Sequence, residues 1–268
     1  MKILNGAELA GFIKERQVHE VASMKERLKR QPTLLIIRDS DNPVIKKYVE
    51  LKIAYGADIG IKVIDYLAQD EADIAARIAA ANDDDTIDGV ILQLPITDKE
   101  RTDEFTALIA PDKDVDGLSG KGNYDSATAT AILWLLAGYD IKLKTCRIAV
   151  VGRGKLVGAP IYKMLTNSGC DVTLFHRGSD LDKLVEYDVI ITATGVPGLI
   201  TSAMVRPGAV IVDAGTASEK GILLGDVAGD VRERRDLAAI TPIVGGVGPL
   251  TVTCLFEHVI RAAKKHKS

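Results

Sequence analysis

The chain has 268 residues, of which 47% are hydrophobic and 26% charged, so it can form one large α/β domain or two modest ones. Its formal net charge of -3 argues against nucleic acid or an anionic membrane as a partner attracted by overall charge. The scattered histidines and cysteines lack metal-ligand spacing, and no apolar run approaches the roughly 20 residues of a membrane span, so we expect a cytoplasmic protein without a metal site.

The first half of the chain alternates short β-rich runs with helical patterns. Three runs rich in branched aliphatic residues predict strands at 33–38, 61–66 and 89–94. Helical patterns follow these runs at 44–57, 70–82 and 99–110. Strands separated by helices of about 10 to 15 residues predict parallel βαβ units.

A segment rich in Pro, Asp, Gly and Ser, at 111–125, interrupts this pattern. A helix is expected at 127–138, with Gly138 as its C-cap. Further strands are predicted at 147–151, 172–175, 188–192 and 209–213, and a last helix at 249–265. The predicted fold class is therefore α/β with two domains and a cleft between them. The catalytic domain spans 1–120 and is joined by the C-terminal helix 249–268, and a Rossmann-like dinucleotide-binding domain spans 121–248.

A glycine-rich turn connects the predicted strand at 147–151 to the helix that follows it. The spacing is GxGxxxG rather than the more common GxGxxG. Glycines at such a turn let the backbone approach a pyrophosphate, which the free N–H groups at the helix N-terminus can bind. The residues expected to contact a dinucleotide here are Gly152, Arg153, Gly154, Val157 and Gly158.

The residues after the next predicted strand distinguish NADP from NAD. That strand is followed by His176 and Arg177, without an acidic residue at its tip to hydrogen-bond an NAD ribose. Arg153 and Arg177 can bind the additional phosphate of NADP, so NADP is the expected cofactor and NAD the less favoured one. The alternative is that both arginines are solvated surface residues, and Asp180 nearby leaves NAD open.

Two later strand ends also carry small residues. Thr194 and Gly195 follow the predicted strand at 188–192, and Gly215 and Thr216 follow the one at 209–213. Small residues at the carboxyl ends of parallel strands leave room for a ligand. Ordinary turn chemistry explains either loop alone, but three such loops in chain order support a cofactor site.

Four residues of the first half are candidates for catalysis or substrate binding. Tyr48 and Lys52 share one face of a predicted helix, where desolvation can lower the pKa of a lysine and suit it to proton transfer. The spacing alone fits equally a half-buried tyrosine beside a solvated lysine. Gln93, at the end of a predicted strand, can hold a lysine or a ligand through its amide. Asp116 can accept N–H groups of a planar heterocycle, or bind magnesium with Asp114, although no third carboxylate is evident.

At these motifs the chain resembles the methylenetetrahydrofolate dehydrogenase/cyclohydrolase (FolD) family. The family's Y-V-x-x-K is present at 48–52, its V-Q-L-P-L-P corresponds to Leu92-Gln93-Leu94-Pro95-Ile96-Thr97, and its K-D-V-D-G is present at 113–117. In the second half, G-R-S-x-x-V-G-x-P corresponds to 152–160, K-P-G-A-V-x-x-D-x-G to 206–215, G-D-V to 225–227 and T-P-x-P-G-G-V-G-P-M-T to 241–251. These matches follow the family order over nearly the whole chain.

The resemblance implies an enzyme that oxidises 5,10-methylenetetrahydrofolate to 5,10-methenyltetrahydrofolate with NADP and hydrolyses the product to 10-formyltetrahydrofolate. It implies that Lys52 is the general acid/base of the hydrolytic step and that Gln93 orients it. Tyr48 would stack on the folate, and Asp116 would bind its pterin N–H groups. The folate site would further include Leu94, Pro95, Gly246, Val247, Gly248 and Pro249. The implied partners are tetrahydrofolate derivatives and a second copy, in a homodimer built through the cofactor domain.

Several positions depart from the family's pattern. Ile45 replaces a serine three residues before the tyrosine, and residues 126–129 replace a P-C-T-P turn. These changes leave open a divergent dehydrogenase of another small pterin or an amino-acid-like substrate, with weak or absent cyclohydrolase activity. A non-catalytic nucleotide-binding relative is a third alternative, against which the retention of Lys52, Gln93 and Asp116 argues.

Overall fold

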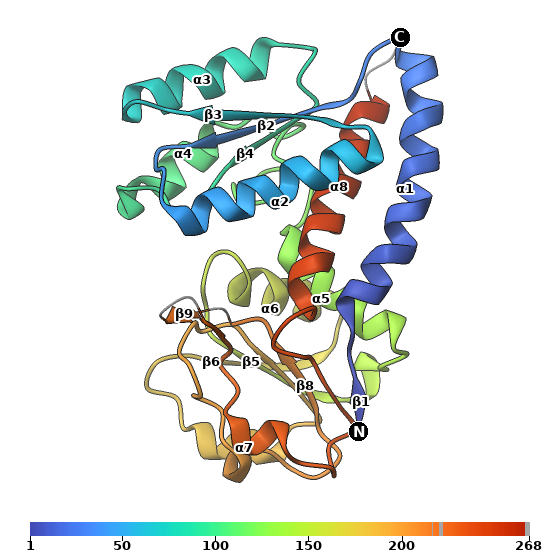
Figure 1. Ribbon diagram of the computed structural model, residues 1–268. Coiled ribbons are helices and arrows are strands. Elements are labelled where there is room, and N and C mark those ends of the chain that lie inside the picture. Colours follow the sequence, from blue (N-terminus) through green and yellow to red (C-terminus); the bar gives the residue numbers. More distant parts are fainter. Residues whose placement is uncertain (216, 220–221, 266–268) are drawn as a thin grey trace. The chain divides into compact units, whose positions relative to one another are not determined.

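The computed structural model describes residues 1–215, 217–219 and 222–265 and divides into two compact units (Figure 1). The three-stranded unit consists of Phe12–Ala127 and the chain from Val252 onward. The six-stranded unit consists of Met1–Gly11 and Thr128–Thr251. The predicted domain limits at 120 and 248 stay a prediction for independently folding domains, and the predicted site residue Thr216 lies outside the described residues.

A parallel sheet with the strand order β3-β2-β4 forms the centre of the three-stranded unit. Its strands are β2 (Thr33–Arg38), β3 (Lys62–Leu67) and β4 (Gly89–Leu92). Its helices are α2 (Pro43–Ile59), α3 (Glu71–Asp83) and α4 (Thr102–Leu108), with a short 3-10 turn η1 (Lys99–Arg101) before α4. β2 is buried along its whole length because it lies between the two other strands, which explains its unbroken aliphatic run. The predicted βαβ pattern is confirmed.

The strand that precedes Gln93 is shorter than predicted. β4 ends at Leu92, two residues before the predicted end. Gln93 and Leu94 therefore begin a loop, and the peptide bond between Leu94 and Pro95 is cis. The backbone at Gln93 remains attached to the sheet, because its N–H donates to the carbonyl of Ile37 at 2.7 Å.

Helix α2 begins and ends at residues with clear capping roles. Asn42 is its N-cap and accepts a hydrogen bond from the backbone N–H two residues later, at 2.9 Å, and Pro43 occupies the first turn. Gly60 closes the helix with a φ of 84°, a left-handed conformation that glycine adopts without strain. The predicted helix at 44–57 is confirmed and continues to Ile59.

Two long helices, α1 (Gly6–Leu28) and α8 (Val247–Lys265), contribute residues to both units. In the three-stranded unit, the buried Gln17 of α1 donates from Nε2 to the carbonyl of Thr253 on α8, at 3.1 Å. Phe256 of α8 stacks on Tyr55 of α2, with ring centroids 5.0 Å apart. The C-terminal helix therefore packs on the first half of the chain, as predicted.

The six-stranded unit contains a parallel sheet with the order β1-β11-β8-β7-β5-β6. Its strands are β1 (Lys2–Ile3), β5 (Arg147–Val151), β6 (Asp171–Phe175), β7 (Val189–Thr192), β8 (Val210–Asp213) and β11 (Ala239–Ile240). The chain passes from β5 to β6 and then places β7 on the other side of β5. In an open parallel sheet, this reversal creates a crevice for ligands at the carboxyl ends of the strands. The glycine turn that follows β5 lies at this switch point.

Helices and a hairpin complete the six-stranded unit. The helices are α5 (Ala127–Gly138), α6 (Gly158–Asn167) and α7 (Gly229–Arg232), with the 3-10 turns η2 (Leu143–Thr145), η3 (Leu181–Glu186) and η4 (Ser202–Met204). The antiparallel hairpin pairs β9 (Ala217–Glu219) with β10 (Ile222–Leu224). The strands β1, β9, β10 and β11 were not predicted, because two or three residues are too few to give a hydrophobic period.

The predicted role of Gly138 as a C-cap is wrong. Gly138 is the last residue of α5, and the left-handed residue beyond the helix is Asp140, with a φ of 59°. A Cβ at Gly138 would lie 2.8 Å from Cδ2 of Leu9 on α1. Glycine therefore lets α1 pack closely on α5 here, and a larger residue would have to displace the end of the Leu9 side chain.

Candidate functional site

Lys52 and Gln93 form a direct pair in the three-stranded unit. The Lys52 Nζ donates to the Gln93 Oε1 at 2.7 Å, although the two residues are 41 positions apart in the chain. The Gln93 Nε2 donates to the carbonyl of Leu94 at 3.0 Å, which fixes the amide so that its oxygen faces the lysine. The lysine comes from α2 and the glutamine from the loop after β4, so the fold brings together two of the predicted catalytic residues.

Electrostatics in this pair suit Lys52 to proton transfer. Burial lowers the pKa of Lys52 below its ordinary value, and the carboxylate of Asp116 partly opposes this shift. Burial raises the pKa of Asp116 to about 6, against the effect of the Lys52 ammonium and with a further contribution from Asp114. The amine and the half-buried carboxyl therefore interact electrostatically, and each is held away from its usual pKa.

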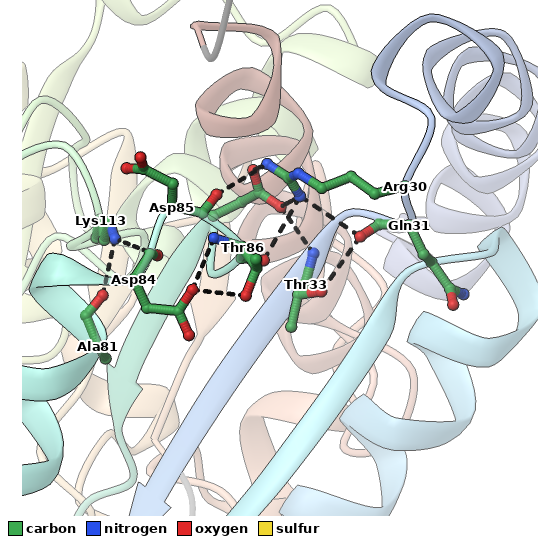
Figure 2. A network of polar contacts seen from close by, with 9 residues as sticks. Arg30, Gln31, Thr33, Ala81, Asp84, Asp85, Thr86 and Lys113 are labelled. Carbon is green, nitrogen blue, oxygen red and sulfur yellow. Dashed lines mark hydrogen bonds and ion pairs between the residues drawn. The ribbon is translucent and has the colours of Figure 1, made fainter. Parts of the chain in front are cut away.

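The segment 113–116 is anchored on both sides of Asp116. The buried Lys113 Nζ donates to the carbonyls of Ala81 and Asp84, at 2.7 and 2.8 Å, where α3 ends. Figure 2 shows the Lys113 amine between these two carbonyls. On the other side, the carbonyl of Asp116 accepts from Ala127 N at 3.3 Å. The motif therefore fixes the backbone that presents Asp116.

Asp114 has a structural role in the same motif. Its buried carboxylate accepts hydrogen bonds from the backbone N–H groups of Gly117, Leu118 and Ser119 and from the Ser119 hydroxyl, at 2.5 to 3.3 Å. These four donors already satisfy its oxygens. Within the described residues, no group of three His, Cys, Asp or Glu side chains is placed to hold a metal ion. The arrangement favours the heterocycle interpretation of this motif over the magnesium one.

His258 of α8 also supports this segment, and sequence reasoning missed it. Its Nδ1 lies 2.8 Å from the carbonyl of Val115, which can only accept, so Nδ1 carries the proton. The imidazole is 2% exposed and its ring lies 5.0 Å from that of Tyr124. Burial lowers the pKa of His258 despite its bond to the Val115 carbonyl. No spacing motif connects a residue of the last helix to one 143 positions earlier.

We expect His258→Ala to lower the free energy of unfolding by about 1–3 kcal/mol, because the variant leaves the buried Val115 carbonyl unpaired. In the wild type, the unfolded chain takes up a proton near the ordinary histidine pKa of about 6.5, whereas the buried imidazole stays neutral to a lower pH. His258 therefore stabilises the fold above that pH, and its contribution declines as the pH falls. Urea denaturation of both proteins at neutral and mildly acidic pH measures the difference, which should narrow on acidification. A difference that widens would contradict this assignment.

The remaining predicted residues of the first half lie on or beside the same elements. Tyr48 lies one turn before Lys52 on α2 and its side chain is 43% exposed, so its ring is available to a ligand. Leu94 is half-buried and Pro95 exposed in the loop after β4. Ile45 is 6% exposed and packs into the core, which accounts for an apolar residue at that position.

The glycine turn of the six-stranded unit borders a cavity of about 600 Å³. This volume lies in the usual range for pockets that bind cofactors. The lining comes from the ends of β5, β6 and β7 and includes the predicted residues Gly152, Arg153, Gly154, His176, Arg177 and Thr194. Val157 is the N-cap of α6 and Gly158 its first residue, directly after the turn. The Ala159 N–H donates to the Gly154 carbonyl at 3.1 Å and Pro160 has no N–H, so the Gly158 N–H is the group of this first turn that can face a phosphate.

Two glycines of the turn are required by close backbone contacts, and the third is not. Gly152 has a φ of 107°, and a Cβ there would lie 2.5 Å from the carbonyl oxygen of Ala193. A Cβ at Gly158 would overlap the carbonyl of Gly152. A Cβ at Gly154 would meet no atom within 4 Å, so this position has room for a larger side chain. Gly152 and Gly158 thus allow the backbone of the turn and the start of α6 to lie close together.

The charges around the cavity suit an anionic ligand. Arg153 and Arg177 are exposed, and in the described part of the chain neither guanidinium has a carboxylate partner. Asp180 does not line the cavity: its carboxylate caps η3 by accepting from the backbone N–H of Asp182 at 3.2 Å. The His176 Nδ1 contacts the carbonyl of Arg177 at 3.0 Å. Two arginines without a carboxylate partner among the described residues are therefore available to a phosphate, and the Asp180 carboxylate is bonded to η3.

Asp226 organises the loop after β7, a role that sequence reasoning did not assign. This fully buried carboxylate accepts from the Thr192 hydroxyl and the Thr194 N–H, both at 2.6 Å, and from the Val196 N–H at 3.0 Å. Gly215 lies directly against it, since a Cβ at that glycine would overlap the Asp226 carboxyl group. The G-D-V match at 225–227 was the available signal for this residue, and Gly195 belongs to the loop that it holds.

The predicted folate residues Gly246, Val247, Gly248 and Pro249 lie in the six-stranded unit, where α8 begins. Gly246 is buried beside α1, since a Cβ at Gly6 would overlap the Gly246 carbonyl. Gly248 is exposed. The structure thus does not bring these four residues into the same unit as Lys52.

Known proteins share both units of this chain. Residues 4–116 match the family model of the tetrahydrofolate dehydrogenase/cyclohydrolase catalytic domain, and residues 126–267 match that of its NAD(P)-binding domain. The bifunctional protein FolD of Macrococcus caseolyticus is 36% identical over 98% of this chain and 98% of its own length. FolD 2 of Lactobacillus johnsonii is 35% identical, with 99% of each chain covered.

Solved structures of similar proteins agree with this relationship. The bifunctional FolD of Campylobacter jejuni superposes with a TM-score of 0.91 at 32% identity, covering 98% of this chain and 99% of its own. The Trypanosoma brucei FolD, complexed with NADP and an inhibitor, has a TM-score of 0.90 at 27% identity, covering 98% and 97%. None of the helices among the described residues combines the length and apolar character that crossing a bilayer requires. The chain belongs to the tetrahydrofolate dehydrogenase/cyclohydrolase family.

Proposed function

We propose that the protein oxidises 5,10-methylenetetrahydrofolate to 5,10-methenyltetrahydrofolate with NADP and hydrolyses this product to 10-formyltetrahydrofolate. The observation that carries the proposal is the Lys52–Gln93 pair, whose amine has a lowered pKa and interacts with Asp116. Full-length similarity to bifunctional FolD proteins supports both activities.

The residues of the three-stranded unit have separate roles in this proposal. Lys52 transfers the proton when water attacks the methenyl carbon, and Gln93 holds the amine in place. Asp116 accepts hydrogen bonds from N–H groups of the pterin, for which its anchored backbone prepares it. Tyr48 offers an exposed ring for stacking on the folate, and Leu94 and Pro95 extend the same surface.

The six-stranded unit holds NADP, which when bound supplies the hydride acceptor. The glycine turn binds the pyrophosphate through Gly152 and the N-terminus of α6. Arg153 and Arg177 bind the additional phosphate. The loop from Thr194, which Asp226 fixes, lines the rest of the cofactor site with Gly195 and Gly215. The assignment of Gly246, Val247, Gly248 and Pro249 to the folate site stays a prediction. The protein contributes position rather than a chemical group to the oxidation.

The proposal extends to assembly and location. The protein forms a homodimer through the six-stranded unit and works in the cytoplasm, where its partners are tetrahydrofolate derivatives. Sedimentation equilibrium of the purified chain measures whether it forms a dimer.

The function is tested by mixing the purified protein with 5,10-methylenetetrahydrofolate and either NADP or NAD. We expect reduced nicotinamide to appear, faster with NADP than with NAD. Hydrolysis is followed separately as the loss of 5,10-methenyltetrahydrofolate. Absence of reduced nicotinamide with both cofactors would reject the dehydrogenase assignment, and an unchanged methenyl signal would reject the cyclohydrolase one.

We expect Arg177→Ala to weaken NADP binding about tenfold, or ~1.4 kcal/mol, because the variant removes a guanidinium that only the additional phosphate engages. NAD binding should change little. Titration calorimetry with each cofactor measures both constants, and Arg235→Ala, at an exposed arginine that does not line the cavity, is the matched control. Equal weakening of both cofactors by Arg177→Ala would reject this role.

A further inference from the structure

The loop that carries Gln93 is attached to β2 at both of its ends. At its start, the Gln93 N–H donates to the Ile37 carbonyl at 2.7 Å. At its end, the Thr97 N–H donates to the Asp39 Oδ2, also at 2.7 Å. Asp39 directly follows β2, and β2 pairs with β4 in parallel, so both anchors lie at the same edge of the sheet.

The conformation of this loop determines where the Gln93 amide points. The amide nitrogen is held by the carbonyl of Leu94, within the loop, and this leaves the oxygen directed at Lys52. Between the anchors, Ile96 is 2% exposed and packs into the core with Phe105. A loop fixed at two hydrogen bonds and one buried side chain has little freedom to turn Gln93 away from the lysine.

The second anchor depends on the residue type at position 97. The family's V-Q-L-P-L-P motif ends in proline, which has no N–H to donate, whereas this chain has Thr97. The anchor also accounts for a carboxylate at Asp39. The Asp39 Oδ1 is buried and has no hydrogen-bond partner among the described residues, so the Thr97 N–H compensates part of the cost of burying the group.

We propose that Asp39 and the Thr97 N–H form a clamp that positions Gln93 against Lys52 for the hydrolytic step. Asp39 is a positioning residue in this proposal, because it acts through the loop and not on the reacting atoms. The inference rests on the proposed cyclohydrolase function. It adds a hydrogen bond that positions Gln93 and that chains with proline at position 97 cannot form, because proline has no N–H.

The test compares Thr97→Pro with Thr97→Ala. The alanine variant keeps the backbone N–H, and the Thr97 side chain has no hydrogen bond among the described residues. Hydrolysis should therefore stay within about twofold of wild type. The proline variant removes the donor, and we expect kcat for methenyltetrahydrofolate hydrolysis to fall about tenfold, by more than KM rises. Asp39→Ala should show the same selective loss. The urea denaturation midpoint of each variant reports whether the chain, including the three-stranded unit that holds the loop, is folded.

A double-mutant cycle separates positioning from a general structural effect. In a Gln93→Ala background, Thr97→Pro should cause no further loss of hydrolysis, because the clamp then has no amide to position.

The inference is overturned if Thr97→Pro and Asp39→Ala hydrolyse at the wild-type rate. It is equally overturned if their losses persist in full without the Gln93 amide, or if Thr97→Ala is as slow as Thr97→Pro. Should Thr97→Pro fail to fold, the same cycle is run with Asp39→Ala in place of Thr97→Pro. Hydrolysis by the wild type is measured first, so that failure of the proposed function is distinguished from failure of the clamp.

Discussion

Lys52→Met is expected to reduce hydrolysis of 5,10-methenyltetrahydrofolate by about 10²–10⁴-fold, the range that a positioned proton-transfer group contributes. Methionine has a similar length but no amine, so it loses both the hydrogen bond to Gln93 and the group whose pKa is lowered by burial. The measurement is the rate of methenyl loss in the absence of NADP. NADP binding should survive, because Lys52 and the glycine turn belong to different units.

A matched control for this variant lies on the same helix. Lys47 of α2 is exposed, and Lys47→Met should leave hydrolysis within about twofold of wild type, because surface substitutions rarely have large effects. If hydrolysis by Lys52→Met also stays near the wild-type rate, Lys52 is not the group that transfers the proton. If both variants lose NADP binding, the effect is on folding rather than on chemistry.

The strands of four or more residues in both sheets and the glycine turn could be predicted from the sequence, because their signals are local. β2 and β5 are unbroken aliphatic runs, and the turn after β5 carries its glycines at fixed spacing. Short elements such as β1 and β11 could not be predicted, since two residues show no period. Local patterns therefore predict the framework that carries the site, but not its smallest parts.

The contacts within the candidate site required the fold. Tyr48 and Lys52 were related by helical spacing, but only the pairing of β2 with β4 brings Gln93 to the lysine. The hydrogen bond between His258 and the Val115 carbonyl joins positions 143 apart, and no sequence pattern predicts it. The position of the Asp39 carboxylate beside Thr97 depends likewise on strand order. Sequence reasoning thus predicted candidate residues more readily than the groups that hold them in place.

The three glycines of the turn before α6 differ in whether the structure requires glycine at their position. All three glycines were predicted to contact a dinucleotide, yet only Gly152 and Gly158 are fixed by neighbouring backbone. Backbone atoms cannot rotate away as a flexible side chain can, so an added methyl group at these positions must move the chain. Gly154 faces open space, which agrees with the serine at this position in the family's G-R-S motif.

Gly158→Ala is therefore expected to weaken NADP binding about tenfold to hundredfold, corresponding to an overpacking cost of about 1–3 kcal/mol. The added Cβ would overlap the Gly152 carbonyl and lie 3.1 Å from the Arg153 N–H nitrogen, so the turn must open and its cradle change shape. Gly154→Ala, in the same turn, should bind NADP within about twofold of wild type, because its methyl group meets nothing within 4 Å. Titration calorimetry with NADP measures both variants. Similar affinities in the two variants would show that the close approach of α6 to the turn does not control cofactor binding. A loss of affinity in Gly154→Ala alone would show that the pyrophosphate lies against Gly154 rather than beside Gly158.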